Sequence, residues 1–188
     1  MSQARRKQSK KPDMPGRVAI SGMHPVRVVL TQDRVSEIWI REGANEHRLK
    51  DLVNTAKAQD VRVTHVSARD FDDAVSQDAN HQSVIAFTKP REMEPENALP
   101  IVLDGLENPL ILVLDGVTDP HNFGACLRSA EAFGAACVVV PKDHSAPLNQ
   151  VARKTSSGAS ELIPVVKVTN LARCLRSLQQ DGFWVVGA

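Results

Sequence analysis

Three polar side chains follow an apolar run in an arrangement that is typical of an active site in an α/β protein. The run covers residues 110–114, and Asp115, Asn122 and Arg128 come after it. A stretch with helical spacing and a second apolar run, residues 137–140, complete a predicted strand–helix–strand unit. In open α/β sheets, ligands bind beyond the carboxyl ends of the strands. We therefore expect a site at the connection that starts with Asp115.

The helix in this unit is predicted from Asp119 to Gly134. Asp119 suits the N-cap, Pro120 the first helical position and Gly134 the C′ position. Arg128 lies seven residues after His121, which places both on one face of the helix. The apolar positions have the spacing i, i+3, i+4, i+7 and predict a buried stripe of Phe123, Cys126, Leu127 and Ala130.

Arg128 has two interpretations that spacing alone leaves open. It could belong to the expected site, because it lies on nearly the same helix face as His121 and can look toward the mouth of the connection. Alternatively, it is a surface charge paired with Glu131 at i+3. Asn122 could be a functional amide or a capping residue. Asp115 favours a turn, and His121 favours a structural role although it titrates near neutral pH.

Several strings resemble one family of RNA-modifying enzymes. DGVTDPHNFGACLRSAEAFGA resembles the first motif of the SpoU-type (TrmH-like) branch of the SPOUT class, which are RNA 2′-O-ribose methyltransferases. PKDHSAPLNQVARKTSSGASELIPVVKVTNLA is similar to the segment after that motif in the bacterial enzymes that methylate a guanosine ribose in 23S rRNA. GMHPVRVVL and HQSVIAFTKP resemble the family's N-terminal substrate-binding domain. The resemblance implies S-adenosyl-L-methionine as methyl donor, ribosomal RNA as substrate, a cytoplasmic homodimer, and no metal.

The resemblance also implies roles for individual residues. Arg128 matches the arginine to which the family assigns activation of the attacking 2′-hydroxyl, and we favour an electrostatic role on the phosphate and the 2′-alkoxide. Asn122 would orient Arg128 or a ribose hydroxyl. Other residues are candidate RNA contacts, although each could instead be a solvated charge or hold a loop by hydrogen bonds: His24, His81, Gln82, Lys142, Arg153 and Lys154.

The family carries two further motifs nearer its C-terminus, a Gly/Glu-rich loop and a Ser-Leu-Asn segment, which form the trefoil knot that holds the methyl donor. This chain ends at FWVVGA, before either motif. The expectation is therefore a partial, mostly parallel α/β SPOUT domain that lacks its C-terminal knot segment. The main cofactor motifs would lie beyond Ala188, with Gly187 and Ala188 as the candidate cofactor contacts here, and the chain by itself would be inactive.

Composition divides the chain into four predicted parts. Residues 1–16 carry five basic residues against Asp13 and predict a disordered tail that contacts phosphate or only aids solubility: Arg5, Arg6, Lys7, Lys10 and Lys11. Residues 17–88 alternate helix and strand signals and predict a small mixed α/β domain. Residues 89–106 begin with a proline- and charge-rich stretch and predict a linker. Residues 107–188 would be the methyltransferase part, with its last strand at 183–186.

Composition also narrows the function classes. Aromatic residues make up 4% of the chain and Tyr is absent, which argues against RNA-binding modules that stack bases on exposed aromatic rings. The three cysteines have no metal-ligand spacing and fit a reducing compartment. No apolar stretch is long enough for a transmembrane helix, and the N-terminus lacks a secretory signal.

Two alternatives to the methyltransferase remain open at the level of sequence. One is a non-catalytic RNA-binding fragment. The other is a Rossmann-like dinucleotide-binding domain, which the strand–helix–strand unit alone would permit. GVTDPHNFGA lacks the close glycine spacing that lets a pyrophosphate approach the backbone, and this disfavours the second alternative.

Overall fold

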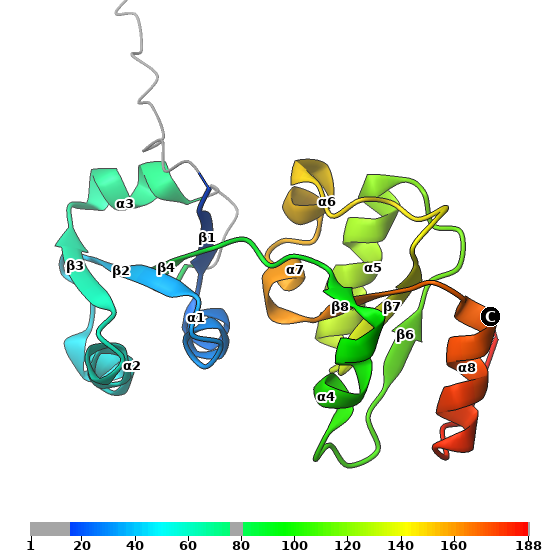
Figure 1. Cartoon of the computed structure of the whole chain (residues 1–188). Coiled ribbons are helices and arrows are strands. Elements are labelled where there is room, and N and C mark those ends of the chain that lie inside the picture. Colours follow the sequence, from blue (N-terminus) through cyan, green and yellow to red (C-terminus); the bar gives the residue numbers. More distant parts are fainter. Residues whose placement is uncertain (1–15, 76–80, 188) are drawn as a thin grey trace, which may run out of the picture. The chain divides into compact units, whose positions relative to one another are not determined.

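A computed structural model describes residues 16–75 and 81–187, and the chain divides after Pro90 into two units, Met1–Pro90 and Arg91–Ala188 (Figure 1). This division lies inside the predicted linker. The tail residues predicted to contact RNA lie outside the described residues, as does Ala188: Arg5, Arg6, Lys7, Lys10 and Lys11.

The first unit is a four-stranded mixed sheet with the order β1-β4-β2-β3. Strand β4 (Val84–Thr88) runs antiparallel to β1 (Val18–Ser21) and to β2 (Val35–Arg41), and β3 (Arg62–Val66) runs parallel to β2. All five residues of β4 are buried, as expected for a central strand that is covered on both faces.

Three helices cover this sheet. Helices α1 (Met23–Leu30) and α2 (Glu46–Ala58) lie on one side and α3 (Ala68–Ala74) on the other (Figure 1). Helices α2 and α3 begin at side-chain caps, Asn45 and Ser67. The buried apolar residues of α1 and α2 recur at helical spacing, so each helix presents one stripe to the core.

The second unit is a parallel sheet with the order β5-β8-β7-β6. Its strands are β5 (Glu94–Pro95), β6 (Ile111–Val113), β7 (Cys137–Pro141) and β8 (Val165–Val168). Helices α5 (Pro120–Ala132), α6 (Gln150–Thr155) and α7 (Ala159–Leu162) cover one face, and α4 (Leu99–Leu103) and α8 (Leu171–Gln180) the other. The mixed and parallel sheets confirm the predicted α/β class.

Side chains of β7 alternate between the two cores of this unit. Val138 and Val140 pack with Phe123 and Leu127 of α5, whereas Cys137 and Val139 pack toward α4 and α8. This alternation results from the pleat of a strand, in which successive side chains point to opposite faces. Since both faces are covered, β7 is an uninterrupted apolar run.

Part of the predicted linker 89–106 is folded. Residues 94–103 form β5, the 3-10 helix η1 (Glu96–Ala98) and α4, all of which belong to the second unit. The prolines permit this because Pro95 ends a two-residue edge strand and Pro100 lies in the first turn of α4, where a missing N–H costs little. Residues 183–187, in contrast, form no strand, and Trp184 is 95% exposed.

Glu96 ties η1 to the start of α8. One carboxylate oxygen accepts the Thr169 N–H at 3.0 Å, and the other accepts from Arg173 Nη2 at 2.9 Å. These two interactions, the backbone hydrogen bond first, lower the pKa of Glu96 below its usual value of 4.5.

We expect a Glu96→Gln variant to lose part of the acid sensitivity of the second unit. A carboxyl whose pKa is depressed on folding stabilises the native state above its ordinary pKa, and this contribution disappears as pH falls through the folded-state pKa. The variant should therefore be less stable at pH 7, and the difference from the native chain should shrink below pH 4.5. Urea midpoints measured from pH 7 to pH 3 check this, and a constant difference would contradict it.

Candidate active site

The expected site lies at the carboxyl edge of the parallel sheet, in the connection between β6 and α5. Leu114 continues β6 by donating its N–H to Val139 O at 2.9 Å, and Gly116 comes after Asp115 with a φ of 71° that glycine adopts readily. Asp115 is exposed in this turn, which agrees with its reading as a turn residue. The Ala146 N–H donates to Val117 O at 2.8 Å and joins this connection to the loop after β7.

Helix α5 begins as the sequence predicts. Asp119 accepts the N–H of Asn122 at 2.8 Å, and Pro120 occupies the first turn. Phe123, Leu127 and Ala130 are buried, and Gly134 has a φ of 69° after the last turn. The buried stripe therefore fixes which side chains of this helix face solvent.

Helix α6 packs against α5 at one unusually close point. A Cβ atom on Gly124 would lie 2.5 Å from Ala152 O and 2.8 Å from Thr155 Cβ, so the backbones approach more closely than any side chain permits. His121 is one turn earlier, with its Nδ1 3.3 Å from Thr155 Oγ1. His121 therefore has a local structural partner, as the sequence analysis favoured.

Arg128 is exposed and has no hydrogen-bond or ion-pair partner among residues 16–75 and 81–187. The alternative pairing with Glu131 is not formed. A helix turns by about 100° per residue, so Arg128 lies about 20° from His121 and about 120° from Asn122. Asn122 is therefore not on the same helix face as Arg128, which weighs against a direct contact that orients this guanidinium.

Basic residues predicted as RNA contacts differ in their surroundings. Lys142 and Lys154 are exposed, at the end of β7 and on α6. Arg153 instead points into a charge cluster, where it donates to the fully buried carboxylate of Glu161 and to Arg91 O. Its guanidinium is therefore committed to the fold, because a buried carboxylate requires a paired cation. This arrangement weighs against an RNA contact by Arg153.

In the first unit, the loop that precedes β4 meets the start of α1. Gln82 accepts the Met23 N–H at 2.9 Å and so caps α1 from another segment, since Gly22 has no side chain to do so. His81 accepts the Ser83 N–H through Nδ1 and lies edge-on to Phe71. His24 is exposed beside them. His81 and the side-chain oxygen of Gln82 therefore have structural roles, and the RNA contacts predicted for His24, His81 and Gln82 stay predictions.

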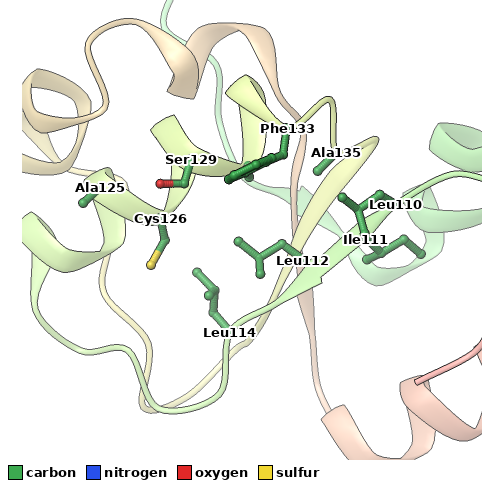
Figure 2. Close-up of a pocket in the computed structure, with 10 residues that line it drawn as sticks. Leu110, Ile111, Leu112, Leu114, Ala125, Cys126, Ser129, Phe133 and Ala135 are labelled. Carbon is green, nitrogen blue, oxygen red and sulfur yellow. The ribbon is translucent and has the colours of Figure 1, made fainter. Parts of the chain in front are cut away.

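An apolar groove of about 430 Å³ lies between α5 and the free edge of β6 (Figure 2). Leu112 and Leu114 line it from the strand, and Cys126, Ser129 and Phe133 line it from the helix. Phe133 is 80% exposed. The sequence analysis missed the groove, although an exposed phenylalanine directly after the buried stripe is a signal that could have indicated it.

The three free cysteines should differ in their reactivity toward alkylating reagents. Cys126 is half-buried in the groove, whereas burial raises the pKa of Cys137 to about 11 and also raises that of Cys174. Since the thiolate is the reactive form, iodoacetamide at pH 8 should modify Cys126 and leave the other two intact. Intact-mass analysis should show one adduct in the native chain and three in urea. A second native adduct would contradict the buried positions.

Two features are absent from the described residues. Among the described residues, no group of three His, Cys, Asp or Glu side chains is arranged to bind a metal ion. Within the same part of the chain, no helix is long and apolar enough to cross a membrane.

The fold thus defines a class of α/β protein. One unit has a parallel sheet, and a smaller unit has a mixed sheet. Two family patterns match the chain: "SpoU rRNA Methylase family" over residues 109–188 and "RNA 2'-O ribose methyltransferase substrate binding" over residues 19–94. The chain belongs to the SpoU family of rRNA methylases. This membership confirms the resemblance of its strings and disfavours the dinucleotide-binding alternative.

Relatives with high identity carry one name, 23S rRNA (guanosine-2'-O-)-methyltransferase RlmB. The protein of Escherichia coli K12 is 45% identical over 170 residues, which cover 89% of this chain and 70% of that protein. The protein of Vibrio cholerae is 47% identical over 170 residues, covering 89% and 68%. The chain therefore spans about two thirds of the length of these relatives.

Two solved structures share the fold. One is the AdoMet-bound rRNA methyltransferase from Sinorhizobium meliloti, with a TM-score of 0.53 at 17% identity, covering 86% of this chain and 59% of that one. The other is the SpoU methyltransferase AviRb from Streptomyces viridochromogenes in complex with AdoMet, with a TM-score of 0.53 at 18% identity, covering 88% and 59%. The chain spans less than two thirds of the length of either solved chain.

Proposed function

We propose that this chain serves methyl transfer from S-adenosylmethionine to a ribose 2′-hydroxyl of ribosomal RNA, with a guanosine of 23S rRNA as the target. One observation carries the proposal. The motif helix α5 presents an exposed arginine, Arg128, that has no ion-pair partner among the described residues, in a chain 45% identical to an enzyme named for this reaction. A homodimer in the cytoplasm belongs to the same proposal, and the free buried thiols support a reducing compartment.

Arg128 would act by charge. Removal of the 2′-hydroxyl proton leaves a developing alkoxide next to a phosphate, and a guanidinium can contact both through its fork of N–H donors. Stabilisation of charge that develops in the transition state lowers the barrier more than it strengthens substrate binding. Asn122, in the first turn of the same helix, would contact the ribose or the base.

The remaining polar contacts would hold RNA without reading its sequence. Lys142, directly after β7, and Lys154, on α6, present exposed ammonium groups, and phosphate contacts of this kind position the nucleic acid. In the first unit, His24 and the amide group of Gln82 would contact RNA at the start of α1. The match of this unit to a substrate-binding family supports that assignment.

S-adenosylmethionine would supply the methyl group as an electrophile, so the reaction needs no metal. The groove beside α5 does not suit it, because apart from Ser129 its lining side chains are apolar and a sulfonium, an amino acid and an adenine all need polar partners. Gly187 lies in an exposed irregular segment that offers no enclosed contact. The residues that line this groove therefore do not fit the methyl donor.

The test is a chimera that adds the C-terminal third of a relative to this chain. Residues 1–188 are joined to the C-terminal segment of the E. coli relative that lies beyond the matched region, and the chimera is incubated with S-adenosylmethionine and 23S rRNA from a strain lacking that enzyme. Nuclease digestion and mass spectrometry should then detect 2′-O-methylguanosine. If a folded chimera binds the RNA but produces none, while the intact relative does, the chain is an RNA-binding protein without this activity.

A further inference from the structure

Two buried N–H donors of the first unit lack an acceptor in the described part of the chain. They are the indole N–H of Trp39 and the Nε–H of Arg41. An indole and a guanidinium can only donate, so only a group that carries an acceptor atom can satisfy them. Because a buried donor without a partner destabilises the fold, nearly all such donors in native proteins are paired, and two exceptions in one unit require an explanation.

Both donors lie on one face of strand β2. The two isoleucines of β2 are buried at the alternate positions, so Trp39 and Arg41 point to the opposite side of the sheet. This is the side that α3 covers, since Trp39 packs against the cluster that contains Phe71 and Arg41 Nη2 lies 3.5 Å from a carboxylate oxygen of Asp72. Residues two apart on a strand are separated by about 6.6 Å, so one small group can reach both side chains.

The carboxylates of this face do not satisfy the two donors. Glu37 accepts from Thr64 Oγ1 at 2.9 Å through one oxygen, and its other oxygen lies 3.8 Å from Arg17 Nη1. Asp72 is paired with Nη2 of Arg41 and not with Nε. Since Arg17 and Arg41 each lie beside a carboxylate, the face has little net charge to attract a phosphate. A neutral acceptor such as a carbonyl oxygen suits these donors better.

The side chains that carry the donors are only partly buried. The side chain of Arg41 is 37% exposed, and Trp39 is half-buried with its ring edge-on to Phe87 at 4.8 Å between centroids. A rotation of these side chains, without unfolding of the sheet, is enough to present both N–H groups to a ligand.

We propose that Trp39 and Arg41 form a binding site for an unpaired RNA base that carries a carbonyl oxygen. Such an oxygen has two lone pairs and can accept from both donors. Sequence-specific recognition of RNA uses unpaired bases, and guanine, uracil and cytosine carry a carbonyl oxygen whereas adenine does not. The inference rests on the proposed function in that RNA is the ligand, which the match of residues 19–94 to a substrate-binding family supports.

Binding of short oligouridine and oligoadenosine to the full chain tests the site. In a Trp184→Phe background, Trp39 is the one tryptophan that remains, so its fluorescence reports on this face. Oligouridine should quench this fluorescence and bind more tightly than oligoadenosine. Trp39→Phe, which keeps an aromatic ring beside Phe87, and Arg41→Met should each weaken oligouridine binding by about 3- to 10-fold, the usual effect of one hydrogen bond, and leave oligoadenosine binding unchanged.

Arg48→Met is the matched control, because it removes an exposed cation from α2 of the same unit. It should change the two affinities by the same factor. Urea midpoints confirm folding, and if Trp39→Phe fails to fold, Arg41→Met and the fluorescence of Trp39 decide the test. Equal affinity of the parent chain for both RNAs, no quenching by oligouridine, or unchanged oligouridine affinity in the folded variants would overturn the proposal. No readout requires methyl transfer, so an inactive chimera of a chain that still discriminates the two RNAs would contradict only the proposed reaction.

Discussion

Arg128→Ala should reduce single-turnover methyl transfer by the chimera by about 100- to 1,000-fold, which is the usual loss when one preorganised donor to a developing oxyanion is removed. Folding should change little, because Arg128 is exposed and has no ion-pair partner in the described parts of the chain. RNA affinity should fall less than the rate, since the charge acts mainly in the transition state. Rates at saturating RNA, with the urea midpoint as the folding control, measure this.

Two variants sharpen the Arg128 test. Arg128→Lys keeps the charge but loses the planar fork, so it should restore little of the rate. Arg176→Ala removes an equally exposed arginine from α8, on the opposite face of the sheet, and should be near the parent rate. An Arg128→Ala chimera that methylates RNA at the parent rate would show that Arg128 is an ordinary surface charge, whatever the other variants do.

Local rules were sufficient for the helix that carries this residue. Asp119, Pro120 and Gly134 were predicted from capping preferences, and each has the predicted role because caps depend on neighbours within a few residues. The exposure of Arg128 likewise agrees with its place off the apolar stripe. The assignment of Arg128 and Asn122 to catalysis stays a prediction, because it rests on the family resemblance.

Contacts between residues far apart in the sequence explain which parts of the fold and of the site could not be predicted. Residues 94–103 were predicted as linker, yet Glu94 pairs with Val166 of β8, a partner 72 residues away that no local pattern indicates. Arg153 was predicted as an RNA contact because no local pattern indicates its interaction with Arg91 O, 62 residues earlier, or with Glu161, eight residues later. Ser157 and Gly158 both have positive φ, and this tight turn between α6 and α7 brings Glu161 back to Arg153. Charges on an exposed helix and charges in a buried cluster look alike until that turn is known.

Gly124 is a residue whose importance the sequence analysis missed. A glycine in the middle of a helix ordinarily lowers the free energy of unfolding by about 0.5–1 kcal/mol relative to alanine. Its presence at such a position therefore indicates a close packing contact. The reason is the crossing of α5 and α6, where a Cβ would be 2.5 Å from Ala152 O, a backbone atom that cannot move aside as a flexible side chain would.

Gly124→Ala should therefore destabilise the second unit by about 1–3 kcal/mol, the typical cost of inserting a methyl group into a closed contact. The sign is diagnostic, because the same change at an open helical position would stabilise the protein by about 0.5–1 kcal/mol. Total stability is about 5–15 kcal/mol for most proteins, so the loss should be visible as a lower urea midpoint. Gly187→Ala, where a Cβ meets nothing within 4 Å, is the matched control and should leave the midpoint unchanged. A midpoint that rises with Gly124→Ala would mean that α5 and α6 separate at little cost, and that this crossing does not hold the Arg128 face of the helix in place.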